Sequence, residues 1–401
     1  MKAGWDTRPL GELCEFQRGL TYAKGDEVES SDNIVLRATN IDLQSNLLDF
    51  SELKYISDHV DVPDGKKVKK DSLMICTASG SKSHLGKVAY IDDDYGYAFG
   101  GFMGMITPKN GLLPKYLFHL MTSDAYKDFI GALADGANIN NLKFDDLKNF
   151  FVPLAPLPEQ RRIVGVLDEA FEGIATAKAN AEKNLQNARA LFESHLQSVF
   201  TRRENEVELS ELASDITDGD HMPPPKAPSG VPFITISDIV KNTREIDFTN
   251  TFTVPMEYFR NLKPNKKPRL GDVLYTVTGA TLGIPVQVKE QRDFCFQRHI
   301  GLVRPKPGTD STWLSYALLS PQVFRQATLG STGAAQKTVS LSVLRGLKVP
   351  KMALTEQKRI AAQLGAVFAE TQRLASIYQQ KLAALDELKK SLLHQAFSGE
   401  L

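Results

Sequence analysis

A long internal repeat constrains this chain more than any other feature. Residues 152–163 recur 197 positions later as residues 349–360, and the correspondence continues without a gap to the end of the chain. Apolar residues match at many positions, as in the pairs Leu167 and Leu364, Phe171 and Phe368, Leu185 and Leu382, Leu191 and Leu388, and Phe200 and Phe397. A period this long lies outside the range of solenoid repeats. The sequence therefore predicts a half-protein that has been duplicated once.

Each copy of the repeat predicts a long helix. Pro158 followed by Glu159 is a helix start signal, and few residues that break a helix come after it. Steps of three and four residues then trace one seam in each copy. The first seam is Leu167, Phe171, Ile174, Lys178, Ala181, Leu185, Ala188, Phe192, His195 and Val199, and the second is Leu364, Phe368, Thr371, Ala375, Tyr378, Leu382, Leu385, Lys389, Leu392 and Ala396. Roughly four-fifths of each seam is apolar, which is typical of a coiled coil.

Two such helices are expected to pair antiparallel and to act as a spacer. At 1.5 Å per residue, about 37–40 helical residues would span roughly 55–60 Å, which is far longer than an ordinary globular helix. The simpler alternative is a core helix pair inside one domain, and the length argues against it.

The segments before the two helices indicate strand-rich domains. Runs such as 72–77 and 102–106 are short, apolar and bounded by turn residues, and the same order recurs in the second half. We therefore predict an α+β fold in which two similar strand-rich globular domains are separated by a long antiparallel coiled-coil helix pair, with a pseudo-twofold internal repeat. The predicted segments are 1–151, 152–203, 204–348 and 349–401.

Charge and cysteine content narrow the functional classes. The chain carries 48 Lys and Arg and 48 Asp and Glu, whereas a nucleic-acid binder usually shows a basic bias. A local basic patch is enough to bind phosphate, because net charge averages over all faces. No apolar stretch is long enough to span a membrane, and the first residues lack the apolar run of a signal peptide. Three cysteines without close pairing favour the reducing cytoplasm and argue against structural zinc or disulfides.

No motif for catalysis, cofactor binding or metal binding is complete. Residues 80–87 look like a phosphate-binding loop, but one residue too many separates the glycines and Val88 stands where Ser or Thr is needed. Residues 99–104 hint at a glycine-rich cofactor loop, but the second copy has lost those glycines, so a close-packed strand is the better interpretation. Seven histidines lie far apart without a ligand spacing. We therefore predict no catalytic residue, no cofactor site and no metal site in this chain.

Polar and basic loop residues remain as candidates for ligand binding. Arg, Lys, Asn and Gln carry donors and acceptors that fit base edges in the major groove of DNA, and lysines can neutralise phosphates. The argument for them is their recurrence in both halves, and the alternative for each is a solvated surface side chain. The candidate DNA-binding residues are Lys66, Lys67, Lys69, Lys70, Lys82, Ser83, His84, Lys87, Asn138, Asn140, His221, Lys226, Lys266, Lys267, Arg269, Gln297, Arg298, His299, Gln336 and Lys337. His221 and Lys226 flank a rigid proline run, which alternatively only shapes the domain surface.

These motifs resemble the specificity subunit of type I restriction-modification systems. The resemblance rests on segments 152–163 and 349–360, each with Val-Pro, then Glu-Gln, then a heptad helix, and on the strand and loop of residues 271–283. It covers essentially the whole chain in the family's order. It implies that segments 1–151 and 204–348 are target recognition domains, that each reads one half of a bipartite DNA site, and that the helices set the gap between the half-sites.

The resemblance also implies partners. The helices, whose seam residues include Leu167 and Leu382, would bind two methyltransferase subunits that carry S-adenosylmethionine and methylate adenine in double-stranded DNA. Motor-nuclease subunits would join them and use ATP and Mg. The specificity subunit itself would be non-catalytic and would act in the cytoplasm. Basic residues are sparse here, so much of the contact with the DNA backbone is expected from the partner subunits.

Two other functional classes stay open from the residues alone. A protein–protein adaptor built on a coiled coil would fit the neutral net charge, and binding assays against DNA of varied sequence would separate it from a DNA reader. An enzyme fused from two halves, such as a self-contained methyltransferase, is disfavoured by the missing catalytic motifs. Binding of S-adenosylmethionine by the isolated chain would favour that enzyme.

Overall fold

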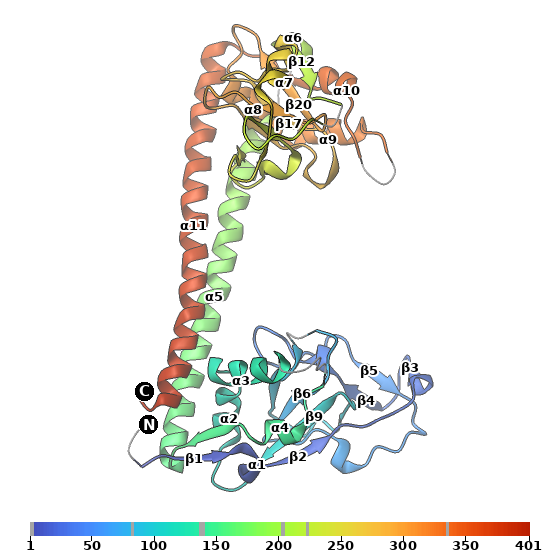
Figure 1. Ribbon diagram of the computed structural model, residues 1–401, viewed down its shortest axis with the longest axis vertical. Helices are drawn as coiled ribbons and strands as arrows, with labels where there is room; N and C mark the ends of the chain where they lie inside the picture. Colours follow the sequence, from blue (N-terminus) through green and yellow to red (C-terminus); the bar gives the residue numbers. More distant parts are fainter. Residues whose placement is uncertain (1–3, 82–83, 136–140, 202–204, 222–223, 334–336) are drawn as a thin grey trace. The chain divides into compact units, whose positions relative to one another are not determined.

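The chain folds into two compact units in the computed structural model (Figure 1). The structure describes residues 4–81, 84–135, 141–201, 205–221, 224–333 and 337–401. Unit 1 comprises residues 1–180 and 381–401, and unit 2 comprises residues 181–380. Each unit therefore combines one globular segment with part of each long helix. The predicted boundaries at 152, 204 and 349 follow the order of the segments, and they stay a prediction about domains.

The two predicted long helices are α5 (Leu157–Phe200, 44 residues) and α11 (Leu354–Ser398, 45 residues). In unit 1 the first half of α5 packs against the last part of α11, with Ile163 and Leu167 in one core with Leu393. In unit 2 the last part of α5 packs against the first half of α11, and the ring centroids of Phe192 and Phe368 lie 5.1 Å apart. The two helices thus run antiparallel in each unit, and every residue of both predicted seams is buried or half-buried.

Unit 1 contains two four-stranded sheets. The antiparallel sheet has the order β2 (Cys14–Arg18), β9 (Met103–Pro108), β6 (Ser72–Cys76) and β7 (Val88–Ile91). The second sheet has the order β3 (Glu27–Val28), β5 (Lys54–Ile56), β4 (Asn33–Leu36) and β8 (Ala98–Phe99), with β4 and β8 parallel. Unit 1 also contains β1 (Asp6–Pro9), which pairs with β10 (Phe151–Leu154), and the helices α1 (Leu10–Leu13), α2 (Pro114–Leu120), α3 (Asp124–Asp135) and α4 (Phe144–Leu147).

Unit 2 repeats this plan with different residues. Its antiparallel sheet has the order β12 (Ala213–Asp218), β20 (Ile300–Pro305), β17 (Val273–Thr276) and β18 (Pro285–Gln287). A three-stranded sheet has the order β16 (Phe252–Val254), β13 (Val231–Ile234) and β19 (Cys295–Phe296), and β13 and β19 are parallel. Unit 2 also contains β11 (Glu206–Glu208) with β21 (Lys348–Pro350), the hairpin β14 (Ile239–Val240) with β15 (Glu245–Ile246), and the helices α6 (Leu209–Leu212), α7 (Met256–Asn261), α8 (Ser311–Leu319), α9 (Pro321–Leu329) and α10 (Leu341–Gly346).

The central strands carry the core of each unit. Every residue of β6 and of β17 is buried, as expected for an inner strand that is covered on both faces. These strands are short apolar runs that begin after a turn, which is why the sequence pattern predicted them. The predicted mixed α+β fold, with two similar strand-rich segments and two long helices, is confirmed.

One buried glutamine explains why the Glu-Gln motif occurs in both copies. The Gln160 side chain accepts a hydrogen bond from Leu113 N at 2.8 Å and donates to the carbonyls of Gly111 at 2.9 Å and Ala155 at 2.8 Å. The Gln357 side chain makes the matching bonds, accepting from Asp310 N at 2.7 Å and donating to Gly308 O at 3.4 Å and Met352 O at 3.0 Å.

Gln160 and Gln357 are almost fully buried, with 0% and 2% of their surface exposed. A buried amide needs partners for both its donor and its acceptor, and these bonds supply them. The glutamines therefore fasten the first turn of each long helix to the loop before α2 or α8.

Candidate nucleic-acid interface

Three segments distant in sequence meet in unit 1 where the central strands β6 and β9 of the antiparallel sheet end and begin. The Phe102 carbonyl, between β8 and β9, accepts hydrogen bonds from Thr77 N at 2.9 Å and Ala78 N at 3.1 Å, just after β6. Ala78 also forms a β-bridge with Asn141, and Leu142 N donates to Thr77 O at 2.6 Å. The loop after β6, the turn before β9 and the segment before α4 therefore form one surface.

Unit 2 builds the same surface from matching segments. The His299 carbonyl, before β20, accepts from Val277 N at 3.0 Å, just after β17. Thr278 bridges to Thr338, and Val339 N donates to Val277 O at 2.8 Å. We call these two surfaces the loop edges: residues 77–81, 100–103 and 141–142 in unit 1, and residues 277–281, 297–300 and 337–339 in unit 2.

The loop edge of unit 2 holds four of the ten candidate DNA-binding residues of that unit. Arg298 and Lys337 are exposed, and Gln297 and His299 are half-buried. Arg298 Nε lies 3.4 Å from His299 Nε2 and donates to it. Burial lowers the pKa of His299, and the neighbouring Arg298 charge lowers it further. A lowered pKa favours the neutral imidazole, which has one acceptor and one donor.

Part of the prediction for unit 1 falls outside the described residues. These positions are Lys82, Ser83, Asn138 and Asn140, and in unit 2 Gln336. His84 is described and half-buried, and burial together with the charge of Lys87 lowers its pKa.

Lys87 stands outside the candidate interface. Only 9% of its surface is exposed, and its ammonium donates to Ile41 O at 2.7 Å. Burial also lowers the pKa of Lys87. The prediction that this lysine contacts a ligand is contradicted, because its side chain turns inward to satisfy a carbonyl of its own unit.

The lysines of the two basic turns make matching internal contacts. Lys66 Nζ donates to Arg18 O at 2.8 Å, and Lys266 Nζ donates to Gly219 O at 2.9 Å. Each bond fastens a 3₁₀ turn, Asp64–Lys66 or Pro264–Lys266, to the chain at the end of β2 or β12. Lys67 pairs with Asp64, and Lys267 donates to Arg260 O and lies over the Phe259 ring.

Other predicted basic residues lie farther along these turns. Lys69, Lys70 and Arg269 are exposed. His221 is bonded to Asp218 at 2.6 Å, and the Lys226 ammonium lies 5.1 Å from the centroid of the Phe252 ring. The latter two contacts fit the alternative that the proline run shapes the domain surface.

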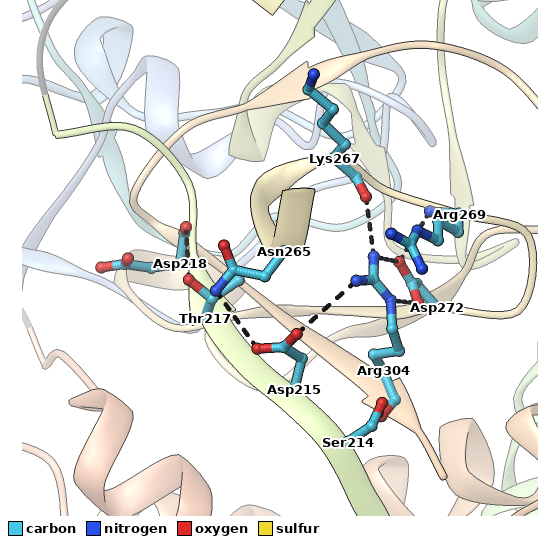
Figure 2. Close-up of polar contacts among 9 residues, drawn as sticks. All are labelled: Ser214, Asp215, Thr217, Asp218, Asn265, Lys267, Arg269, Asp272 and Arg304. Atoms are coloured by element: carbon cyan, nitrogen blue, oxygen red, sulfur yellow. Dashed lines mark hydrogen bonds and ion pairs between the residues drawn. The ribbon is translucent and has the colours of Figure 1, made fainter. Parts of the chain in front are cut away.

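A buried ion pair holds the basic turn of unit 2 (Figure 2). Arg304 Nε and Nη2 donate to the two oxygens of Asp272 at 3.0 and 2.7 Å, and Nη2 also donates to Lys267 O at 2.9 Å. Asp272, 2% exposed, accepts a further bond from Arg269 N at 2.8 Å. A bidentate guanidinium–carboxylate pair of this kind is strong and directional. It therefore fixes the backbone of the turn that presents the exposed Arg269 side chain.

In unit 1, neutral side chains stand at the positions of this ion pair. Strand pairing of Leu73 with Ile106, and of Val273 with Val303, places Ser72 and Thr107 where unit 2 has Asp272 and Arg304. The Ser72 hydroxyl donates directly to Lys69 O in its own turn.

Sequence reasoning missed Phe102. The prediction of a close-packed strand for residues 99–104 holds for Phe99 and Met103, which are buried, but it is wrong for Phe102, which is 74% exposed. The glycines at 100 and 101 form a turn between two strands, so Phe102 leaves the core. The repeat offset of 197 residues places Phe102 opposite His299, and that alignment could have singled it out.

Among the residues that the structure describes, no group of three or more His, Cys, Asp or Glu side chains is placed to hold a metal ion. Within the same residues, no helix is both long enough and apolar enough to cross a membrane.

The family model and the similar proteins point to the same family. A model described as the type I restriction modification DNA specificity domain matches residues 2–186. The chain is 25% identical to the type I restriction enzyme EcoKI specificity subunit of Escherichia coli (strain K12), over 99% of this chain and 89% of that protein. It is 24% identical to the StySPI specificity subunit of Salmonella potsdam, with the same two coverages.

Solved structures agree in fold. A chain from a structure entitled "Structural basis underlying complex assembly and conformational transition of the type I R-M system" matches with a TM-score of 0.80, at 22% identity over 100% of this chain and 99% of that one. The HsdS subunit from Thermoanaerobacter tengcongensis matches with a TM-score of 0.62, at 22% identity over 100% and 98% of the two chains. Residues 2–186 therefore match the type I restriction modification DNA specificity domain, and nearly the whole chain is similar to the specificity subunits of type I restriction enzymes.

Proposed function

We propose that each unit reads one half of a bipartite, asymmetric DNA site through its loop edge. The observation that carries this proposal is that the same three-segment edge is built twice, on the same backbone hydrogen bonds, but with different side chains. A common frame with different side chains suits two readers of different sequences. In unit 2, Gln297, Arg298 and His299 lie in one turn, where Arg298 is exposed and the other two are half-buried. Side chains of these types supply donors and acceptors for base edges.

Phosphate contacts would position the units without reading sequence. The exposed Lys69, Lys70 and Arg269 are the candidates for this role, because their turns are fastened by internal bonds and their charged groups face solvent. These basic residues are few, and the chain carries no net charge. The proposal therefore assigns much of the salt-dependent affinity to partner subunits.

The long helices would set the spacing between half-sites and bind two methyltransferase subunits. Leu191 on α5 and Leu388 on α11 are related by the repeat and are 59% and 47% exposed. Two equivalent exposed leucines fit two copies of one partner, and large exposed apolar side chains often mark protein contacts. S-adenosylmethionine, ATP and Mg would be held by the methyltransferase and motor-nuclease subunits. The proposed place of action is the cytoplasm, and the three free, buried cysteines fit a reducing compartment.

Mapping methylated adenines after co-expression with the modification subunit tests the proposal. The wild type should direct methylation to one bipartite sequence. Arg298→Ala should relax the second half-site at one base pair, with a discrimination loss of about 1–3 kcal/mol, and should leave the first half-site unchanged. Arg325→Ala is the matched control, because Arg325 is an exposed arginine on α9 in the same unit.

Two results would count against the proposal. Methylation without any shared sequence in the wild type would remove the specificity role. A change of both half-sites in Arg298→Ala would contradict independent reading by the two units.

A further inference from the structure

We infer that Phe102 is a base-reading side chain of unit 1 and that it makes an apolar contact with the methyl group of a thymine in the first half-site. This inference rests on the proposed function, since it names one contact within the proposed complex with DNA. Phe102 was not among the residues that the sequence pattern singled out for DNA binding.

Phe102 stands out from the surface of unit 1 on a tight turn. Met103 N donates to Gly100 O at 2.8 Å, so residues 100–103 form a four-residue turn with Phe102 at its third position. The side chain is 74% exposed. Folding therefore gains little from this phenyl group, because most of its area remains in water.

The turn beneath Phe102 is held rigidly. The Phe102 carbonyl accepts three hydrogen bonds, from Thr77 N and Thr77 Oγ1 at 2.9 Å each and from Ala78 N at 3.1 Å. Gly19 packs so tightly under the turn that a Cβ there would lie 1.9 Å from Gly100 O. An exposed aromatic group on a fixed backbone loses little entropy on binding, because only its own two side-chain torsions need to be ordered.

The surroundings of Phe102 favour a nucleic-acid base over a protein partner. Polar residues lie around its turn. Thr21 is exposed and lies beside Gly101, Thr77 bonds the Phe102 carbonyl, and Asn141 is exposed and bridges to Ala78. The other strongly exposed phenylalanine of unit 1, Phe151 at 63%, instead lines a groove with apolar residues including Phe150 and Phe397. A protein contact would prefer the apolar surroundings. A single apolar group among hydrogen-bonding groups matches a base edge on which a methyl adjoins polar atoms.

Unit 2 places a different reader at the same point. Ile300 N donates to Gln297 O at 3.0 Å, so His299 also occupies the third position of a four-residue turn, and its carbonyl also bonds the strand end at Val277. The two units therefore present a phenyl group and a neutral imidazole at equivalent positions. Phenyl can meet only an apolar group or a ring face, whereas imidazole can exchange hydrogen bonds with a base edge. The half-sites are expected to differ at the base pair that this position meets.

Thymine is the natural match for Phe102 in the major groove, because its 5-methyl group is the apolar feature of the four base pairs there. Deoxyuridine lacks only this methyl group and pairs in the same way. Loss of one buried methyl should weaken recognition about fourfold.

The test uses the full chain in complex with its modification subunit and duplexes in which each thymine of the first half-site is replaced in turn by deoxyuridine. For the wild type, methylation at low substrate concentration should fall about fourfold at one thymine. Phe102→Ala should be slower on the unmodified duplex and should show no further loss at that thymine. Phe102→Leu keeps an apolar group and should retain most of the sensitivity, while Phe151→Ala should behave as the wild type.

The outcomes separate the inference from the proposed function. If the wild type shows no sequence preference at all, both fail. If the wild type is specific but no thymine of the first half-site is sensitive, or if Phe102→Ala keeps the full sensitivity, the inference alone is overturned. Melting curves of the variants verify that each is folded, which is expected because the side chain is exposed.

Discussion

At the scale of single residues, the two copies keep a position and change the chemistry that fills it. The clearest case is the pair beneath the basic turn, where Asp272 and Arg304 in unit 2 correspond to Ser72 and Thr107 in unit 1. A buried ion pair costs much in desolvation, so its net stabilisation over neutral groups is small, whereas loss of one partner is severe. The neutral pair of unit 1 therefore shows which residues could replace the ion pair of unit 2.

Asp272→Ser should destabilise unit 2 by up to about 3–5 kcal/mol, because it removes the bidentate partner of Arg304. Only the carboxylate of Asp215, 3.9 Å from Arg304 Nη1, then remains as a partner. Adding Arg304→Thr should restore most of the loss, since it copies the neutral arrangement of unit 1. The chain has two tryptophans, and Trp313 is fully buried in unit 2. Urea unfolding followed by Trp313 fluorescence in a Trp5→Phe background therefore reports on unit 2. A double variant no more stable than Asp272→Ser would contradict the idea that the loss comes from the Arg304 charge left without its bidentate partner.

At the scale of elements, the β14–β15 hairpin of unit 2 is fastened to the helix pair by one arginine. Arg244, in the tight turn with φ +54°, places its guanidinium 4.0 Å from the ring centroid of Phe368 and 4.8 Å from that of Tyr316. Gln372 on α11 adds a bond to Asn242 O at 3.0 Å. In unit 1 the corresponding turn residue, Asn46 with φ +60°, donates to Val88 O instead. The same turn shape therefore serves a helix contact in one unit and a sheet contact in the other.

Arg244→Ala should loosen the hairpin from the helices. A desolvated cation–π contact stabilises by about 2 kcal/mol, so amide hydrogen exchange of residues 239–246 should become roughly 30-fold faster if it proceeds by local opening. Arg244→Lys keeps the charge but lacks the planar stacking group, so it should give a smaller increase. Asn46→Ala in unit 1 serves as the control and should leave residues 239–246 unchanged. Equal exchange in Arg244→Ala and the wild type would rule out this role for the arginine.

At the scale of the whole chain, local patterns were predictable and long-range contacts were not. The seams of α5 and α11 follow from apolar spacing along one helix, and the buried runs of β6 and β17 follow from their own residues. The loop edges depend on bonds such as Phe102 O with Thr77 N, between residues 25 positions apart, for which no local pattern exists. Lys87 and Phe102 were misjudged for the same reason, since a lysine's inward turn and a phenylalanine's exposure are decided by the neighbouring segments.

The proposal that the helices act as a spacer makes a prediction for the whole molecule. Four residues inserted after Ala181 in α5, with four after Gln380 in α11, add about one turn to both helices. The added length of about 6 Å exceeds one base-pair step of about 3.4 Å, so the methylated sites should have a spacer one or two base pairs longer. Both half-sites should stay the same, because the loop edges lie outside the insertions. An insertion in α5 alone is the control: it breaks the register of the antiparallel seams and should lower stability and methylation together. An unchanged spacer in a stable double-insertion variant, again mapped by sequencing methylated adenines, would mean that the helices do not measure the distance between half-sites.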